Sequence, residues 1–362
     1  MAAEWTKAAD ERTGREVWQI TAGRAASHFC YQTAQGFTAD ERYVLFSSDR
    51  TGPWQLYRAD LLTGEVDRIS DVADYHHDSF SMHSNGREML FTGGERLFRA
   101  DVASGEIVDV IDLGGQLPGS WRGHAMPVSA DGRRTVLSWH DGGDRYGLAV
   151  VHLADRRVEI VLDAPTGPLL HPQFCPGQAE LICFCWFPDT QDDMSLPMEQ
   201  RARNWVIDTH TRETRPFLMC PYGSRGTHEY WNADGTRLYF HRKTEPGWVP
   251  TSLCSIDREG GDWQTHYTHE TLKLGHSDIT ADERWIVTDV QEPDENPLLL
   301  VDVPAAAAEV LCWPNSSLTG GHAKQAHVHP SFSPRGGFVG FTSDRTGRPQ
   351  VYVVPLRGDG PD

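Results

Sequence analysis

The chain has 362 residues and a formal net charge of −18, from 51 acidic and 33 basic side chains. A field of this sign repels nucleic acid and anionic membranes, so we expect neither as a partner. An acidic small substrate remains compatible with the charge if the site itself is locally positive. There is no apolar signal core and no run as long as a membrane span, and the seven cysteines lack framework spacing. These features predict a cytoplasmic protein with reduced thiols, and they carry no signal for an oligomeric state.

A turn flanked by apolar residues recurs seven times along the chain. The copies open at Phe37, Met82, Val128, Phe174, Trp231, Ile279 and Phe332. Each turn leads into a short β-like run, at residues 43–46, 88–91, 135–138, 181–184, 237–240, 285–288 and 338–342. Copies of about 45 to 55 residues with several short strands predict an all-β fold, a seven-bladed β-propeller of four-stranded blades. We expect one propeller domain over residues 16–358, preceded by a loose segment at residues 1–15.

Four consecutive copies carry a histidine three residues before the apolar residue that opens the turn. These slot histidines are His171, His228, His276 and His329. Equivalent positions in a closed ring of repeats converge on its axis, which predicts that the four side chains meet in the central channel. Hydrogen-bonded structural histidines are the alternative interpretation.

Other histidines fit this pattern less well. His28 and His124 lie near the slot on two other copies and are candidates for lining the same channel. His76, His77 and His83 miss the slot, which favours structural or surface roles for them.

The last copy adds ligands that suit a metal. Gln325, His327 and His329 alternate along an expected innermost strand and so face the same way. The slot of the preceding copy adds His276. Three imidazoles and an amide oxygen suit Mn²⁺, Zn²⁺, Ni²⁺ or Fe²⁺, whereas Ca²⁺ and Mg²⁺ prefer oxygen ligands. We therefore predict a divalent metal site at these four residues.

Several strings resemble those of the oligogalacturonate lyases, a family of seven-bladed propeller polysaccharide lyases. They occur in the same order over nearly the whole chain. The two most specific strings are Thr227-His-Glu-Tyr-Trp231 and His327-Val-His-Pro-Ser-Phe332. Further matches are Gly52-Pro-Trp54, His171-Pro-Gln173, Arg203-Asn-Trp205 and Phe341-Thr-Ser-Asp344.

The resemblance implies a metal, typically Mn²⁺, held by three histidines and a glutamine, with His228 as catalytic base and Arg203 as substrate-binding residue. It also implies an acidic oligosaccharide substrate. The chain departs from the family at the glutamine, whose position is taken by Lys324, so Gln325, His322 or water remain alternatives for the fourth ligand. For Arg203, a solvated surface charge is the alternative interpretation.

The implied chemistry is β-elimination in a uronate chain. It removes the C5 proton next to the carboxylate and expels the glycosidic oxygen from C4. A metal and Arg203 would neutralise the carboxylate, and a neutral His228 would take the proton. We also expect His171 to contact a sugar carboxylate or hydroxyl. Trp186 replaces a polar family residue and could stack on a sugar face.

Two other functions remain compatible with the sequence. One is a non-catalytic propeller that binds a sugar or protein partner at its channel mouth. The other is a metal-dependent uronate epimerase that shares the same proton abstraction.

Overall fold

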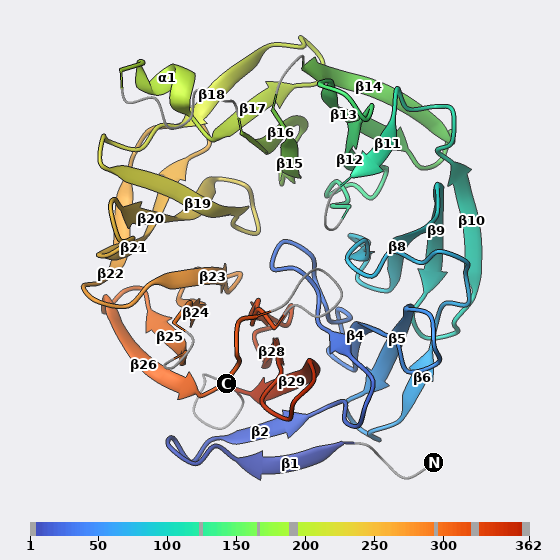
Figure 1. Cartoon of the computed structure of the whole chain (residues 1–362), viewed down its shortest axis with the longest axis vertical. Coiled ribbons are helices and arrows are strands. Elements are labelled where there is room, and N and C mark those ends of the chain that lie inside the picture. The colour runs from blue at the N-terminus through green and yellow to red at the C-terminus, as the bar shows by residue number, and fades with distance from the viewer. Residues whose placement is uncertain are drawn as a thin grey trace.

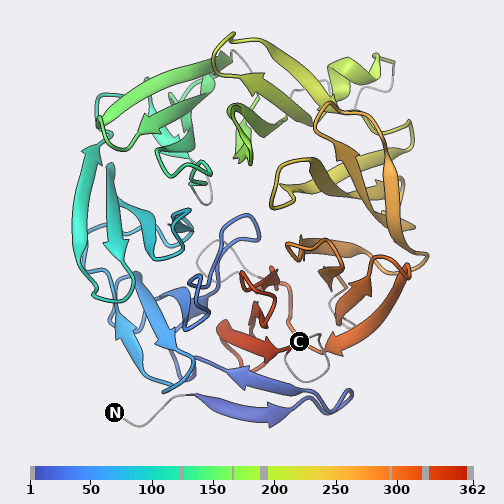
Figure 2. The same cartoon turned by 180° about the vertical axis from the view of Figure 1, so that it is seen from behind.

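Seven antiparallel sheets are arranged in a ring around a common axis (Figure 1). The structure is a computed structural model and describes residues 5–122, 126–164, 167–187, 195–292, 296–319 and 326–356. In six sheets the four strands follow one another in chain order across the sheet, and the same ring is seen from behind (Figure 2). The predicted seven-bladed β-propeller of four-stranded blades is thus confirmed.

Blades 1 to 3 come first along the chain. Blade 1 consists of β3 (Ser27–His28), β4 (Tyr43–Ser48), β5 (Gln55–Asp60) and β6 (Val66–Arg68). Blade 2 consists of β7 (Ser81–Met82), β8 (Glu88–Gly93), β9 (Arg96–Asp101) and β10 (Ile107–Asp112). Blade 3 consists of β11 (Ser120–Arg122), β12 (Arg134–His140), β13 (Tyr146–His152) and β14 (Arg157–Ala164).

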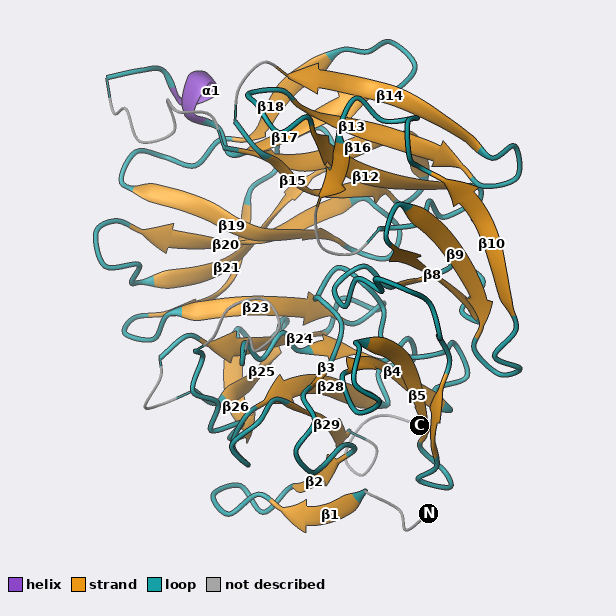
Figure 3. Ribbon diagram, turned by 45° about the vertical axis from the view of Figure 1, so that its right-hand side comes forward, coloured by secondary structure: helices purple, strands orange, loops and turns teal. Residues whose placement is uncertain are grey.

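Blades 4 to 6 continue around the ring. Blade 4 consists of β15 (Leu169–Cys175), β16 (Gln178–Trp186), β17 (Asn204–Asp208) and β18 (Thr214–Leu218). Blade 5 consists of β19 (Ser224–Trp231), β20 (Arg237–Thr244), β21 (Thr251–Asp257) and β22 (Gln264–His269). Blade 6 consists of β23 (Leu274–Ile279), β24 (Trp285–Val290), β25 (Leu298–Asp302) and β26 (Ala307–Cys312). Within the described ranges the one helix, α1 (Met198–Arg201), precedes β17 at the rim, and no helix there is long and apolar enough to cross a membrane (Figure 3).

Blade 7 joins the two ends of the chain. It consists of β27 (Ser331–Phe332), β28 (Phe338–Ser343), β29 (Gln350–Pro355), β2 (Glu16–Gln19) and β1 (Thr6–Ala9). β2 pairs with β29 through Trp18↔Val353 and Gln19↔Tyr352, so the N-terminal chain closes the ring.

The prediction of a loose segment at residues 1–15 is wrong over residues 6–9. These residues form β1, whose side chains are exposed and therefore show no apolar alternation. Asp10 organises the turn to β2 by accepting a hydrogen bond from the Thr13 N–H at 2.9 Å. Backbone pairing with β2 and this polar turn thus hold the exposed strand. A single domain over residues 16–358 stays a prediction, since the described residues end at 356.

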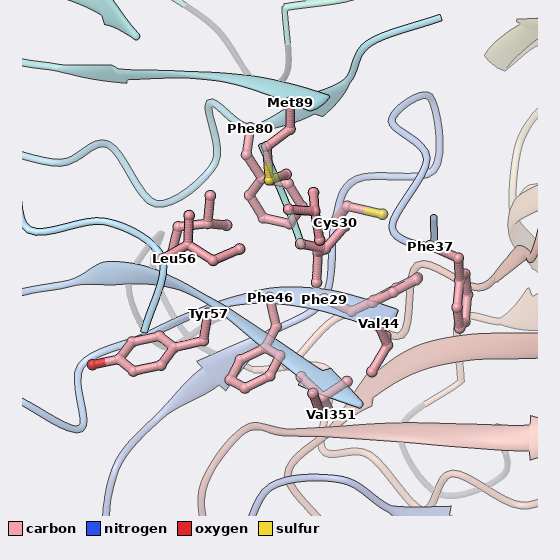
Figure 4. Close-up of a cluster of buried hydrophobic side chains, with 14 of the residues drawn as sticks. Phe29, Cys30, Phe37, Val44, Phe46, Leu56, Tyr57, Phe80, Met89 and Val351 are labelled. Atoms are coloured by element: carbon pink, nitrogen blue, oxygen red, sulfur yellow. The ribbon is translucent and has the colours of Figure 1, made fainter. Parts of the chain in front are cut away.

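The hydrophobic core lies between the faces of neighbouring blades. Five of the six residues of β4 are buried, because blades pack on both of its faces. The cluster in Figure 4 joins blade 1 to Phe80 and Met89 of blade 2 and to Val351 of blade 7. Phe46 in this cluster has no exposed surface, and burying such a side chain contributes about 1.5–3 kcal/mol. This packing holds the innermost strands, and the side chains on them, in fixed relative positions.

Candidate metal centre and active site

The four slot histidines lie on or beside the innermost strands of blades 4 to 7. His171 is on β15, His228 on β19 and His276 on β23, whereas His329 lies two residues before β27. At the histidine of each of the first three strands, the pairing register with the next strand shifts, as in a β-bulge. His171, His228 and His329 also have positive φ angles of 51°, 56° and 44°. Such backbone is uncommon outside glycine and clusters at functional sites.

His327 and His329 converge for a different reason from the one predicted. Residues 326–330 form no strand, so the expected alternation along one strand face is wrong there. Pro330 has no N–H to donate to a ladder, and β27 begins only at Ser331. His329 has a left-handed backbone instead, and its ring centroid lies 4.1 Å from that of His276.

Three imidazoles from two adjacent blades form a cluster whose nitrogen atoms are close enough to bind one metal ion. The candidate ligand nitrogens of His276, His327 and His329 all lie within 4.8 Å of one another. The ring centroids of His276 and His329 are 4.1 Å apart, and His327 lies 5.9 Å and 5.6 Å from them. His276 is buried and the other two are half-buried. This donor set fits a borderline divalent ion such as Mn²⁺ or Zn²⁺.

Asp289 on β24 orients one of these imidazoles. Its Oδ2 lies 3.1 Å from His276 Nδ1, and its Oδ1 accepts the backbone N–H of His276 at 2.5 Å. The carboxylate is buried, with 1% of its side chain exposed. A hydrogen bond at Nδ1 leaves Nε2 of His276 as the nitrogen available to an ion, an arrangement common behind metal-binding histidines.

His228 lies directly beside the cluster. Its ring centroid is 4.3 Å from that of His276 and 5.7 Å from that of His241. Burial lowers the pKa of His228 well below its usual value, and the neighbouring His276 and Lys243 lower it further. A neutral imidazole at this position has a nitrogen lone pair and can accept a proton.

Arg203 is not a solvated surface charge, because only 13% of its side chain is exposed. Its Nη1 donates to the backbone oxygen of Gly226 at 3.2 Å and lies 3.5 Å from Glu229 Oε1. Glu229 also accepts a hydrogen bond from Cys185 Sγ at 3.3 Å. Gly226 and Glu229 belong to β19, which carries His228, so the buried ion pair holds the guanidinium next to the proposed base.

Tyr31 enters the site from the loop before β4, which extends toward the centre of the ring (Figures 1 and 2). Its ring stacks on His171 with centroids 5.0 Å apart and planes at 16°. The same ring meets His329 edge-on at 5.1 Å and His276 at 6.1 Å. The ring of Tyr31 therefore lies between His171 and the cluster and contacts both.

His28 belongs to a separate group of rings on the first blades. Its ring centroid is 5.2 Å from Trp54 and 6.1 Å from His77. His77 also stacks on His76, which meets Trp121 at 4.8 Å. The predicted role of His28 in substrate binding stays a prediction, to which these aromatic neighbours add possible sugar-stacking surfaces.

Trp186 packs against Trp205, with ring centroids 5.0 Å apart and planes at 59°. Successive residues of a strand face opposite sides, so Trp186 on β16 faces away from Cys185, which contacts Glu229. This places the ring against the hydrophobic core of blades 3 and 4. Stacking of Trp186 on a sugar stays a prediction that these contacts do not favour.

Two predicted site residues, His124 and Gln325, lie outside the described residues, as do Lys324 and His322. The three alternatives for a fourth ligand therefore stay open.

Three further residues of the site were not singled out from the sequence. Tyr31 lies in a loop with no distinguishing motif, whereas Asp289 is the single acid of an otherwise uncharged run, 285–290, a signal that was available. Lys243 is 2% exposed, and its Nζ donates to Gln291 Oε1 at 3.2 Å. Burial lowers the pKa of Lys243 to about 8. The positive charge of Lys243 also lowers the pKa values of His228 and His276, so the three buried groups interact electrostatically.

Comparison with known proteins gave matches along nearly the whole chain, although no protein-family model matches. The oligogalacturonide lyase of Pectobacterium atrosepticum is 22% identical, covering 96% of this chain and 95% of its own length. The oligogalacturonate lyase of Dickeya dadantii is also 22% identical with the same coverage.

Solved structures gave the same picture for the fold. An oligogalacturonate lyase in complex with manganese superposes with a TM-score of 0.84 and 22% identity, covering 98% of this chain and 96% of that one. The oligogalacturonate lyase of Vibrio parahaemolyticus superposes with a TM-score of 0.83 and 19% identity, covering 98% and 97%. In sequence over nearly its full length and in its seven-bladed fold, this chain is similar to the oligogalacturonate lyases.

Proposed function

We propose that this protein is a metal-dependent lyase that cleaves short uronate-containing oligosaccharides by β-elimination, with oligogalacturonate as the first substrate to test. The observation that carries the proposal is the position of His228, a buried imidazole of lowered pKa whose ring lies 4.3 Å from a three-histidine cluster. The names of the similar proteins supply the substrate class.

His276, His327 and His329 would hold the metal, with Mn²⁺ as first choice because a similar solved lyase contains manganese. When bound there, the ion supplies positive charge that neutralises the substrate carboxylate and acidifies the adjacent C–H. Arg203 contributes a second, fixed positive charge. Since Glu229 and Gly226 hold its guanidinium in place, Arg203 binds the carboxylate without reorganising.

The chemical step then needs a base at C5. His228 accepts the C5 proton, and its low pKa keeps the ring neutral before the reaction at neutral pH. Asp289 and Glu229, the carboxylates described beside the cluster, are engaged with His276 and Arg203. Hydrolysis by a pair of catalytic carboxylates is therefore less consistent with the site than elimination.

Ultraviolet absorbance tests this proposal, because elimination creates a conjugated unsaturated uronate. With Mn²⁺ and digalacturonate, the wild-type protein should produce that absorbance. His228→Ala should lower kcat by about 10²- to 10⁴-fold, the usual contribution of a general base, with Mn²⁺ still bound. His210→Ala, which alters an exposed turn histidine, is the matched control and should behave as wild type.

Two outcomes contradict the proposal. Wild-type protein that binds Mn²⁺ and exchanges the C5 proton without new absorbance would be an epimerase. Full turnover by His228→Ala would show that another group is the base.

A further inference from the structure

Elimination also needs a proton donor, a role that neither the base nor Arg203 fills. Breaking the C4–O bond leaves the electron pair on the glycosidic oxygen, and an alkoxide is a poor leaving group unless it is protonated as it departs. His228 starts neutral and acts as the base. The donor must therefore be another group close to the cluster, and it must carry a proton at neutral pH.

Tyr31 meets both conditions, whereas Lys243, the other protonated group described at the site, donates to Gln291 Oε1. The phenol of Tyr31 is protonated at neutral pH, because burial raises the pKa of this tyrosine above the ordinary value of about 10. The ring contacts two of the three candidate metal ligands, at 5.1 Å from His329 and 6.1 Å from His276. Cys185, Glu229 and Arg203 are near enough to act electrostatically on its hydroxyl. Tyr31 therefore contacts the metal cluster and also lies within electrostatic reach of Arg203.

The environment holds this ring in one position. His171 stacks on it in near-parallel geometry, at 5.0 Å and 16°, and has a left-handed backbone with a φ of 51°. His171 is thus a positioning residue for Tyr31. Arg203 provides a positive charge near the oxygen that would become a phenolate.

We propose that Tyr31 is the catalytic acid, donating its phenolic proton to the glycosidic oxygen that leaves C4. This inference rests on the proposed lyase function. His228 removes the C5 proton, the C5–H electron pair forms the C4=C5 double bond, and the C4–O pair goes to the oxygen, which takes the Tyr31 proton. The products are an unsaturated uronate and a sugar with a free hydroxyl. The proton on His228 then returns to the Tyr31 phenolate through water, which restores both groups.

The test is Tyr31→Phe, which removes only the hydroxyl. On digalacturonate, kcat should fall by about 100-fold or more, with KM and Mn²⁺ affinity changed less than about threefold. A galacturonate carrying a 4-nitrophenyl ether at C4 has a leaving group that needs no proton. On this substrate the variant should retain at least half of the wild-type kcat. Tyr57→Phe, which removes a hydroxyl bonded to Thr51 away from the channel, is the control and should match wild type on both substrates.

Two results overturn the assignment. Wild-type kcat for Tyr31→Phe on digalacturonate shows that the hydroxyl is not needed. An equal loss on both substrates shows that Tyr31 acts on binding or position and not on the leaving group. If wild-type protein itself forms no unsaturated product from either substrate, the lyase function fails, which is a separate outcome.

Discussion

The carboxylate of Asp289 can reach His276 because Gly275, the residue that precedes this histidine in the chain, has no side chain. A Cβ atom on residue 275 would lie 2.1 Å from Asp289 Oδ1, so the absence of a side chain there lets the carboxylate reach both the backbone and the ring of His276. The sequence pattern identified His276 through its place in the repeat. It did not identify Tyr31, whose contacts with the site come from a distant loop without a motif, or Asp289, whose position as the single acid of run 285–290 does not by itself name His276 as its partner.

The hydrogen bond that Asp289 accepts from the His276 ring should affect the metal affinity, which can be measured. Asp289→Asn removes the negative charge that orients and polarises His276, and loss of such a partner typically weakens metal binding by about 10- to 100-fold. Titration calorimetry with Mn²⁺ gives the dissociation constants of variant and wild type. Asp302→Asn, in the same blade but paired with Arg284 at 3.9 Å, should bind like wild type. Unchanged affinity in Asp289→Asn would mean that the carboxylate does not support a metal ligand.

At the scale of single elements, the sequence predicted the second strand of each blade better than the first. The expected runs 43–46 and 338–342 lie inside β4 and β28. They could be recognised from the sequence because five residues of each strand are buried and the runs are rich in apolar residues. Innermost strands such as β3 and β27 have two residues, too few for a periodicity. On β15, β19 and β23, bulges interrupt the alternation at the histidine. The residues that carry the proposed chemistry therefore lie where regular patterns are weakest.

The turn between β1 and β2 contains Asp10, and the pKa of this carboxyl is shifted downward. Burial alone would raise the pKa of Asp10, but hydrogen bonds from the N–H groups of Trp313 and Thr13, both at 2.9 Å, help to lower it overall. A lowered pKa means that the stabilisation is present above the unfolded-state pKa of about 3.9 and is lost as pH falls through the folded-state value.

Asp10→Ala should therefore lower the free energy of unfolding by about 1–3 kcal/mol at pH 7, and the difference from wild type should shrink below about pH 4. Urea unfolding at pH 7 and at pH 3.5 measures both effects. Asp155→Ala, an exposed turn residue, should change stability by less than about 0.5 kcal/mol at either pH. A difference that is constant with pH would contradict the role given to the Asp10 carboxylate.

At the scale of the whole molecule, the number of sequence repeats predicted a ring of seven blades. The positions of the slot histidines predicted which blades contribute side chains to one site. Ring closure by β2 and β1 was not predicted, because β1 is exposed throughout and β2 has four residues, too few for an apolar pattern. The site spans three consecutive blades, since the candidate ligands come from blades 6 and 7 while His228 comes from blade 5. The chain carries a net charge of −18, yet Arg203 and Lys243 are buried beside the cluster. Glu229 and Asp289 are buried there too, so a bound divalent ion would supply the net positive charge that favours an acidic substrate.

The most direct test of the account is formation of unsaturated uronate by protein stripped of metal with a chelator and then reloaded. We predict that the stripped protein gives no absorbance increase with digalacturonate. Stoichiometric Mn²⁺ should restore the increase in the wild type but not in His276→Ala. Equal rates with and without metal, or no product from the Mn²⁺-loaded wild type, would contradict the claim that imidazoles from neighbouring blades hold a cation that serves β-elimination.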